Sequence, residues 1–521
     1  MHSIGWIIGI VVAALAAGLT VVVRTRWLQS HTLAKCVVLS VGLHLLLAVA
    51  CGLLAGFMPA SWGHDEEGRM TMVMVVASDP EAVIHHVEPA APAAEAAEPV
   101  AAATPDTPRL AQEPPAEPVS GDGVPADVVP LLNAAVEAAA ADDTVATDDT
   151  PEHPLPNAYA NRTPARRTAA AIARGGSEAT EQAVRRALEW LAANQAEDGR
   201  WETVRHGGGR GQVGAQRNQA TGVGSDHGVT GLALLAFLGA GSTHTTGPHA
   251  DCVAKGIRFL VDRQRADGSL AGEAEFFATL YCHGMAGIAL AESAAMTGDA
   301  SLRGPLERAV GFTLAMQHPV TGGWRYAAGD KGDTSQLGWQ VMLLAAAAQA
   351  GLDAGPDSGI DRGRQRARTF LQSVSSGQAG GLAAYRTGER PTMPMTAEAL
   401  FCRLVLGATA ADPSVREAVA VIAGSPPTAA RPNAYAWYYA TLASFHVGGP
   451  QWDAWNRRMQ PAVMSLQRQD TGPLRGSWDP DPVWGGHGGR VYATAMAALT
   501  LEVYYRYVPL SGESPQVAKN R

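Results

Sequence analysis

The sequence has few cysteines and only a small surplus of basic residues in its C-terminal two thirds. Five cysteines in 521 residues, none of them in a CxxC pair, argue against a disulfide framework. Of the 40 basic residues, three precede residue 59 and two lie in 59–160, which leaves 35 against 30 acidic residues in 161–521. Such a balance provides no basic field for nucleic acid, so we expect no nucleic-acid partner.

The first 58 residues contain no acidic residue and hold two long apolar runs, 4–23 and 33–58. Each run is long enough to cross a bilayer as a helix, which takes about 20 residues. Arg24, Arg26 and Lys35 lie in or beside the connection, which the positive-inside rule places in the cytoplasm. We therefore expect residues 1–58 to anchor the chain in a bacterial inner membrane, with everything that follows outside the cytoplasm. A cleaved signal peptide followed by one anchor is the alternative.

The next segment has almost no aromatic residues and is rich in Ala, Pro and acid. Residues 59–160 carry 19 acidic residues against two arginines, a balance of about −17 in a chain whose net charge is −9. A segment of this composition buries too little apolar surface to fold. The sequence predicts a disordered linker over 59–170, a folded domain over 171–510 and a disordered tail over 511–521.

The folded domain is built from repeats. Four segments share a plan in which an amphipathic helix ends in a polar turn with Gly, followed by Trp or Leu: ALEWLAANQAEDGRW (187–201), GIRFLVDRQRADGSL (256–270), AVGFTLAMQHPVTGGW (309–324) and ARTFLQSVSSGQAGGL (367–382). A looser copy is VMSLQRQDTGPLRGSW (463–478), and 412–424 supplies a sixth amphipathic helix. Spacings of roughly 40 to 60 residues indicate a repeat architecture.

A more apolar helix accompanies each of these amphipathic helices. Its copies are rich in small residues and lie at 226–241, 281–299, 333–351, 395–409, 434–449 and 491–505. Helices that are apolar nearly all round must be buried. We therefore predict an all-α fold in which six outer-inner helix pairs close into an α/α-toroid. Small residues in matching registers would let the inner helices approach closely: Gly231, Gly287, Gly338, Ala399, Ala440 and Ala495.

The helix-Gln-Gly-x-Trp pattern resembles the QW repeat of squalene and hopene cyclases. It is present as Leu191, Gln195, Gly199 and Trp201, and again as Phe312, Gln317, Gly323 and Trp324. The count of six pairs is similar to the toroid that those cyclases share with the beta subunits of protein prenyltransferases. The resemblance covers about 176–508 and implies either an isoprenoid-processing enzyme or a protein that has kept only the fold.

The resemblance implies an acid site at residues 330–335, DKGDTS. Bacterial hopene cyclases protonate an alkene with the middle Asp of a D-x-D-D-T-A motif, and Gly332 falls at that position. Asp330 and Asp333 match the outer two carboxylates, and Glu398 lies about one turn deeper in the expected ring. These three residues are the candidate acids. The alternatives are that Asp333 is a helix N-cap and that Glu398 pairs with Arg403.

The zinc site of the prenyltransferases has no match. In that family a His lies near the last inner helix, where this chain has Ala493. No metal and no cofactor are expected from these residues. Asp226 and Cys282 align with Asp333 at the inner-helix starts, and His227 and His283 lie one residue on. These groups are candidate ligand-binding residues, with helix capping or a divalent metal as the alternatives.

Aromatic residues on the predicted inner helices complete the candidate ligand-binding set. Such rings stabilise carbocations in cyclases through their π faces, and they would equally line an apolar binding pocket or fill gaps between helices. The remaining candidates are Gln336, Trp339, Phe401, Trp437 and Tyr492.

Three hypotheses about function remain. The preferred one is a non-catalytic toroid that binds an apolar or isoprenoid-like small molecule, or a segment of an envelope protein, at the inner-helix mouth. The second is a divergent terpenoid cyclase or prenyltransferase-like enzyme. The third is a structural cell-envelope scaffold. An open central cavity would favour the ligand hypotheses, and a ring filled by side chains would oppose them.

Overall fold

The computed structural model describes residues 155–210 and 222–510. The predicted membrane anchor, most of the predicted linker and the predicted tail lie outside these residues. In the part of the chain that is described, no helix is both long and apolar enough to cross a membrane.

The described domain is almost entirely helical and contains two sets of six helices. The inner set is α7 (Asp226–Gly239), α9 (Ala278–Thr297), α11 (Thr334–Gln349), α13 (Met393–Val405), α15 (Ala434–Val447) and α17 (Gly485–Leu501). The outer set is α6 (Glu178–Ala193), α8 (Ala250–Asp262), α10 (Arg303–Met316), α12 (Gly359–Val374), α14 (Pro413–Ala423) and α16 (Gly449–Met464). These helices confirm the predicted all-α fold, and each predicted pair is present.

Apolar spacing explains which helix is inner and which is outer. In α8 the buried side chains Val253, Ile257 and Leu260 recur at helical spacing, so that one face packs inward and the other meets water. In α7 every residue after Asp226 is buried. A helix that is apolar all round is stable only when it is surrounded by other helices, and this places it in the inner layer.

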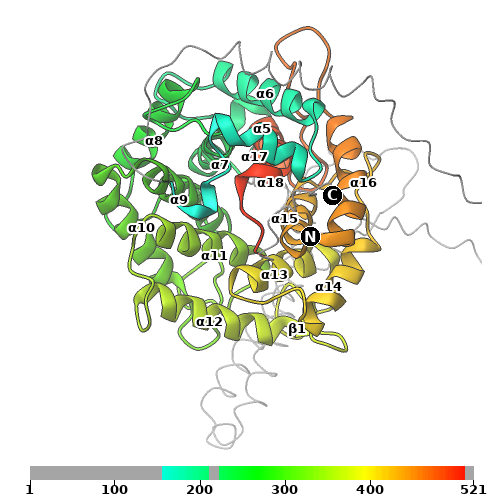
Figure 1. Ribbon diagram of the computed structural model, residues 1–521. Helices are drawn as coiled ribbons and strands as arrows, with labels where there is room; N and C mark the ends of the chain where they lie inside the picture. Colours follow the sequence, from blue (N-terminus) through cyan, green and yellow to red (C-terminus); the bar gives the residue numbers. More distant parts are fainter. Residues whose placement is uncertain (1–154, 211–221, 511–521) are drawn as a thin grey trace, which may run out of the picture. The chain divides into compact units, whose positions relative to one another are not determined.

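The inner helices close into a ring. Each packs against the next in chain order, and α17 packs against α7 to complete the circle. Figure 1 shows the outer helices arranged around them, with α16 beside α6 at the junction between the last and first repeats. The closed arrangement agrees with the predicted α/α-toroid rather than with an open solenoid.

The glutamine of the repeat ties neighbouring outer helices together. The Nε2 group of Gln195 donates to the carbonyl of Gly199 in its own turn and to the carbonyl of Cys252 in α8, at 2.8 and 2.9 Å. Gln264, Gln317 and Gln467 each make the same pair of bonds, to their own turn and to another outer helix. The last of these reaches Ala183 of α6 and so closes the outer ring.

The tryptophan of the repeat is buried between the two layers. The indole Nε1 of Trp201 donates to the carbonyl of Leu191 at 2.8 Å, and Trp324 makes the equivalent bond to Thr313. Both rings are fully buried. Each therefore buries a large apolar area while its N–H keeps a partner, as a buried indole requires.

The turn after α12 lacks the glutamine and uses a different link. Glu417 on α14 accepts hydrogen bonds from the backbone N–H groups of Gln378, Ala379 and Gly381. The two short strands β1 (Ser375–Ser376) and β2 (Leu382–Ala383) pair antiparallel beside this turn. A carboxylate on the next helix thus replaces the glutamine amide of the other turns.

Close approach of inner helices requires glycine at Gly231. A Cβ atom added there would lie 2.6 Å from the backbone of Met285 and Ala286 in α9. No side chain larger than hydrogen fits at that distance, so this predicted small-residue contact is confirmed.

An N-terminal segment packs at the end of the ring where the inner helices finish. It contains the 3₁₀ turn η1 (Asn157–Tyr159) and α5 (Pro164–Ala173). Arg162 is fully buried and pairs with Glu292 at 2.6 Å, and Arg506 of the short helix α18 (Val503–Arg506) pairs with the same carboxylate at 3.2 Å. Residues 155–170 are therefore folded, which differs from the linker boundary placed at residue 170. Composition could not reveal this because the segment is held by ion pairs to distant residues.

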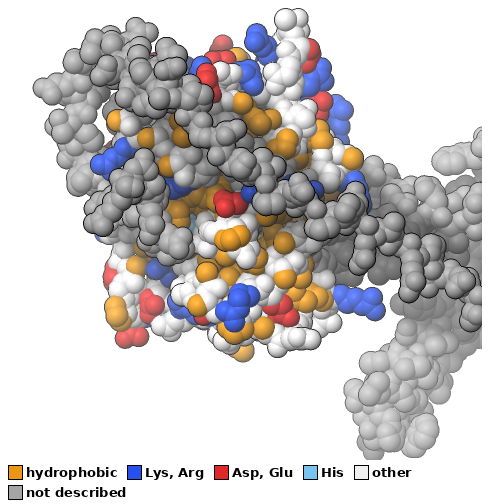
Figure 2. All heavy atoms as spheres, turned by 45° about the vertical axis from the view of Figure 1, so that its right-hand side comes forward, with side chains coloured by type: hydrophobic (Ala, Val, Ile, Leu, Met, Phe, Trp, Pro, Cys, Tyr) orange, Lys and Arg blue, Asp and Glu red, His pale blue; other side chains and the backbone are white. Residues whose placement is uncertain are grey.

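The visible surface mixes charges of both signs. In Figure 2 Lys and Arg side chains are interspersed with Asp and Glu side chains over the coloured atoms. This distribution agrees with the near balance of charge in 161–521.

Candidate functional site

An apolar pocket lies where the N-terminal ends of the inner helices meet. Its volume is about 100 Å³, and α7, α9, α11, α15 and α17 all contribute residues to its wall. Aromatic rings dominate the lining: Phe277, Tyr281, Trp339, Tyr435, Trp484 and Tyr492. A concave, largely apolar site with a few polar groups is typical of small-molecule binding.

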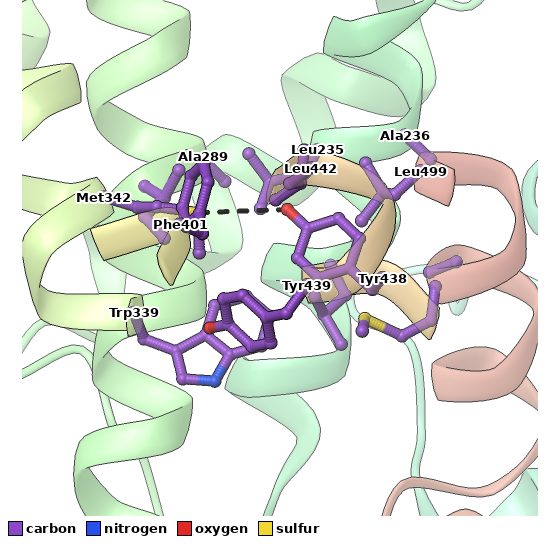
Figure 3. Packing of buried hydrophobic residues seen from close by; sticks show 14 of the residues in the cluster. Leu235, Ala236, Ala289, Trp339, Met342, Phe401, Tyr438, Tyr439, Leu442 and Leu499 are labelled. Carbon is purple, nitrogen blue, oxygen red and sulfur yellow. Dashed lines mark hydrogen bonds between the residues drawn. The ribbon is translucent and has the colours of Figure 1, made fainter. Parts of the chain in front are cut away.

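The ring is filled below this pocket. Trp339 stacks on Tyr438 with a 6.1 Å centroid separation, and Phe401 and Tyr439 pack beside them (Figure 3). These four side chains are at most 2% exposed. The described residues therefore leave a pocket at the mouth instead of an open chamber through the ring. By the criterion set above, the filled centre opposes a ligand inside the ring, and the mouth is the remaining candidate site. An engineered cavity of about 150 Å³ holds one benzene, so this pocket suits a compact apolar group.

Asp333 is the N-cap of α11, which confirms the capping interpretation. Its Oδ1 atom accepts from the backbone N–H of Gln336 at 3.0 Å and from the Ser335 hydroxyl at 2.8 Å. Its Oδ2 atom pairs with Arg325 at 2.9 Å and accepts from the Tyr385 hydroxyl. Burial raises the pKa of Asp333 to about 6, and these hydrogen bonds and the Arg325 charge oppose that rise. Asp333 does not line the pocket.

The position that matches the cyclase proton donor cannot carry a side chain. Gly332 has a φ of +102°, and a Cβ atom there would lie 2.6 Å from the backbone of Gly323 and 2.9 Å from the ring of Phe370. The neighbouring Asp330 accepts a hydrogen bond from the backbone N–H of Ala327 in the same loop. A catalytic role for Asp330 or Asp333 stays a prediction.

Glu398 is fully buried on α13 and has no ion-pair partner among the described residues. Its Oε1 atom accepts from the backbone N–H of Gly338 at 2.8 Å, and its Oε2 atom is hydrogen bonded to the Tyr435 hydroxyl. Arg403, the expected partner, donates instead to Gly381 and Ser375. Burial raises the pKa of Glu398 well above its usual value. Because Tyr435 lines the pocket, Glu398 is one side chain away from it.

The predicted histidines face the outer helices. His227 packs against Phe259 of α8 at a 4.7 Å centroid distance. His283 accepts from the backbone N–H of Leu270 and bonds to Thr313 of α10 at 2.9 Å. Burial lowers the pKa of both histidines to about 4, so both are neutral. The structure therefore gives the two rings separate partners, and no group of three or more metal-ligating side chains occurs in the described ranges.

Other predicted ligand-binding residues fall into two groups. Cys282, Trp339 and Tyr492 line the pocket. The rest lie elsewhere: Asp226 pairs with Arg200, Gln336 donates to the carbonyl of Phe277, Phe401 packs in the filled centre, and Trp437 lines a separate cavity of about 130 Å³ between α15, α16 and α17.

Sequence reasoning missed several residues of the pocket wall. Tyr281 and Tyr435 occupy the first turns of α9 and α15, and Phe277 is the residue before α9. Trp484 comes from the Pro- and Gly-rich segment before α17. Their position at the starts of inner helices was the available signal, because those ends converge on the mouth of the ring.

Comparison with solved structures finds several similar chains. A type II terpene cyclase from Scytonema is 15% identical, with a TM-score of 0.42 over 63% of this chain and 98% of that one. An alpha-amylase from Clostridium perfringens is 9% identical (TM-score 0.45; 62% and 97% covered), and an inactive variant of an alpha-1,6-mannanase from Salegentibacter sp. HEL1_6 is 10% identical (TM-score 0.41; 63% and 99% covered). No curated protein sequence matches the chain.

One family model matches part of the domain. Residues 165–285, which run from α5 to the first turns of α9, match the model described as the squalene-hopene cyclase C-terminal domain. The described domain is a closed α/α-toroid of helix pairs, and residues 165–285 of it are similar to the squalene-hopene cyclase C-terminal domain.

Proposed function

We propose that this protein binds a compact apolar group, such as the end of an isoprenoid-like molecule, in the pocket at the inner-helix mouth. The observation that carries the proposal is the aromatic, apolar pocket of about 100 Å³ built by five inner helices. Rings such as Tyr281, Trp339 and Tyr492 offer large contact area at little conformational cost, which suits recognition of an apolar group.

The size of the pocket favours binding of part of a molecule. The filled centre below Trp339 leaves no room for a folded triterpene in the described ring. The side-chain-free Gly332 also argues against alkene protonation of the hopene cyclase type. These two features support a binding domain over a cyclase of that type.

The cellular setting is part of the proposal. The two apolar runs before residue 59 and the basic residues between them favour a membrane anchor with the toroid outside the cytoplasm. In that setting the ligand would be a membrane-derived isoprenoid-like molecule, and an envelope protein segment is the competing occupant.

Filling the pocket tests the proposal. Ala278 lines the pocket at the start of α9, so Ala278→Phe places a ring in the space. We expect the affinity of the full chain in lipid nanodiscs for geraniol, measured by saturation-transfer NMR, to fall at least about tenfold, the loss from removing roughly 1.4 kcal/mol of binding.

Ala411→Phe is the matched control. This exposed residue lies in the loop between α13 and α14, beyond the C-terminal end of an inner helix. It should bind geraniol as the unchanged protein does, and thermal unfolding should show that both variants are folded. Equal geraniol affinity in Ala278→Phe and the unchanged protein would refute the proposal, and crosslinking to one envelope protein in place of geraniol binding would favour a protein segment as the occupant.

An enzyme that uses a buried acid is the second candidate. Glu398 has no cationic partner in the described domain and is joined to the pocket through Tyr435, so it favours a proton-transfer role over a purely structural one. Incubation with squalene and shorter polyprenyl alcohols, followed by gas chromatography, would reveal a cyclised product. Product formation that is lost in Glu398→Gln would support catalysis in place of simple binding.

A further inference from the structure

The protonation state of Glu398 determines which way its hydrogen bonds run. A buried carboxylate without a cationic partner is costly, so such a group takes up a proton. The raised pKa of Glu398 agrees with this. Its Oε1 atom already accepts from the backbone N–H of Gly338, which leaves Oε2 to carry the proton.

The acid proton then has one partner. Oε2 is hydrogen bonded to the hydroxyl of Tyr435. A protonated Oε2 has no other recorded partner in the described domain, so it donates its proton in that pair. The hydroxyl oxygen of Tyr435 therefore accepts, and its own proton is free to donate elsewhere. In the described domain no second acceptor is recorded for this hydroxyl, and Tyr435 lines the pocket.

Two more polar groups in the pocket wall have no partner. The indole Nε1 of Trp339 and the hydroxyl of Tyr492 are buried and make no hydrogen bond to the described residues. The two side chains are 1% and 7% exposed, and both line the pocket. Because a buried donor without a partner is costly, three donors on side chains that line an apolar pocket point to an acceptor in the ligand, although the pocket surface itself is almost wholly apolar.

We propose that the ligand is an apolar molecule that carries one acceptor oxygen, as a carbonyl, ether or hydroxyl group, and that Tyr435 donates a hydrogen bond to it. In this arrangement Glu398 is a positioning residue, because it holds the Tyr435 hydroxyl as a donor toward the pocket. The inference rests on the proposed function, since it specifies the chemistry of the molecule that the pocket binds.

Paired probes of the same shape test the inference. Cyclohexanone carries a C=O group, which accepts a hydrogen bond, where methylenecyclohexane carries a C=CH₂ group, which does not. In the full chain in nanodiscs, Tyr435→Phe should weaken cyclohexanone binding by about three- to tenfold, the range expected for one neutral hydrogen bond, and leave methylenecyclohexane binding unchanged.

The matched control is Tyr438→Phe on the same helix. Tyr438 is buried, its hydroxyl faces the sulfur of Met342, and it does not line the pocket. It should bind both probes as the unchanged protein does. Equal weakening of the two probes in Tyr435→Phe, or no weakening of either, would overturn the inference and leave the proposed function intact. If neither probe binds the unchanged protein, the proposed function fails as well.

Infrared spectroscopy examines the role of Glu398 independently of binding. At pH 7 the protein should show the C=O stretching band of a protonated carboxylic acid, and the same band should be weaker in Glu398→Gln, so that the spectrum of the unchanged protein minus that of the variant contains the Glu398 band, while the contribution of the neutral Glu502 cancels. Absence of the band from the difference spectrum would mean that Glu398 is ionised, and the proposed direction of the Tyr435 hydrogen bond would be wrong.

Discussion

Two buried glutamate side chains in this domain differ in protonation state, one being ionised and the other neutral. Glu292 lies between two arginines, which hold its pKa below the usual value although burial acts to raise it. Glu502 lies at the C-terminal end of α17, and its carboxyl oxygens have no hydrogen-bond partner in the described part of the chain. Burial raises the pKa of this carboxyl group to about 8. The distance to a guanidinium group therefore decides which glutamate is ionised at neutral pH.

Replacement of Glu502 should alter the pH dependence of stability. Its folded pKa of about 8 exceeds the unfolded value, so the unchanged protein loses stability as the pH rises from about 4.5 to 8. Glu502→Gln cannot lose a proton. We compare the two proteins by the free energy of unfolding of Glu502→Gln minus that of the unchanged protein. We expect this difference to increase by about 1.4 kcal/mol per pH unit above about pH 4.5 and to reach roughly 3 kcal/mol at pH 7.

Urea unfolding at pH 5, 6 and 7 measures this effect. Glu307→Gln is the control, because Glu307 is 52% exposed and pairs only with Arg303 on its own helix. If the free energies of unfolding of Glu502→Gln and of the unchanged protein differ by the same amount at all three pH values, Glu502 is not held neutral.

Asp333 contributes to stability as a cap rather than through the pocket. Asp333→Ala removes the acceptor for the Gln336 backbone N–H and the partner of Arg325 and Tyr385. We expect a loss of about 2–4 kcal/mol in the free energy of unfolding, from a lost cap and a broken buried ion pair. Urea unfolding should show a smaller loss, below about 1 kcal/mol, for Asp330→Ala, since Asp330 is less buried and accepts one backbone bond. Equal losses would contradict the capping role.

At the scale of secondary-structure elements, the repeat glutamines hold the outer layer together. Each reaches from its own turn to another outer helix, and Gln467 makes the bond that joins the end of the chain to α6. The amide bonds two carbonyl groups at once, one in its own turn that has no helical partner and one in an outer helix. Leaving a buried acceptor without a partner costs about 1–3 kcal/mol, so these links are more than surface contacts.

Gln467→Ala should therefore open the ring at its junction. It leaves the carbonyl of Gly476 without its partner, removes the side-chain bond to the carbonyl of Ala183 in α6 and removes the acceptor for Arg186. We expect a loss of about 2–4 kcal/mol and faster hydrogen exchange in α6 and α16 than in α10. Gln365→Ala is the matched control, because that side chain is exposed and donates only to Asp361 on its own helix. Uniform exchange across the three helices would contradict the junction role.

The helices themselves were predictable from local pattern, but the pocket wall was not. Apolar spacing identified both helix sets, and Trp339, Tyr492 and Cys282 were expected to bind ligand and do line the pocket. Tyr281 and Tyr435 were missed, and Phe401 packs in the filled centre. The reason is that inner helices are apolar on every face, so the sequence does not show which face points to the ring axis.

At the scale of the whole molecule, the domain depends on residues before its first repeat. The segment that holds Arg162 lies against the C-terminal ends of the inner helices, where Arg162 and Arg506 share Glu292. Tyr159 packs on the Arg162 guanidinium, 4.0 Å from ring centroid to Cζ. The N-terminal segment and α18 therefore close one end of the ring, and the pocket lies at the other.

A protein that begins at residue 171 should be less stable than one that begins at residue 155. Its Glu292 and Arg506 lose one buried partner, a change that costs about 3–5 kcal/mol. Differential scanning calorimetry of the two proteins measures the difference, and Arg162→Met in the longer one separates loss of the ion pair from loss of the segment. Equal unfolding temperatures for the three proteins would show that the segment is dispensable.

The sequence by itself determined the helix pairs, the positions of glutamine and tryptophan in the repeats and the missing carboxylate at Gly332, because each depends on the spacing of residues along one stretch of chain. Only the tertiary structure decided that the ring centre is filled, that Glu398 has no cationic partner within residues 155–210 and 222–510, and that residues 155–170 belong to the fold. These outcomes depend on which side chains from distant helices come into contact and on how much water their packing excludes. Local sequence pattern predicts neither of these features.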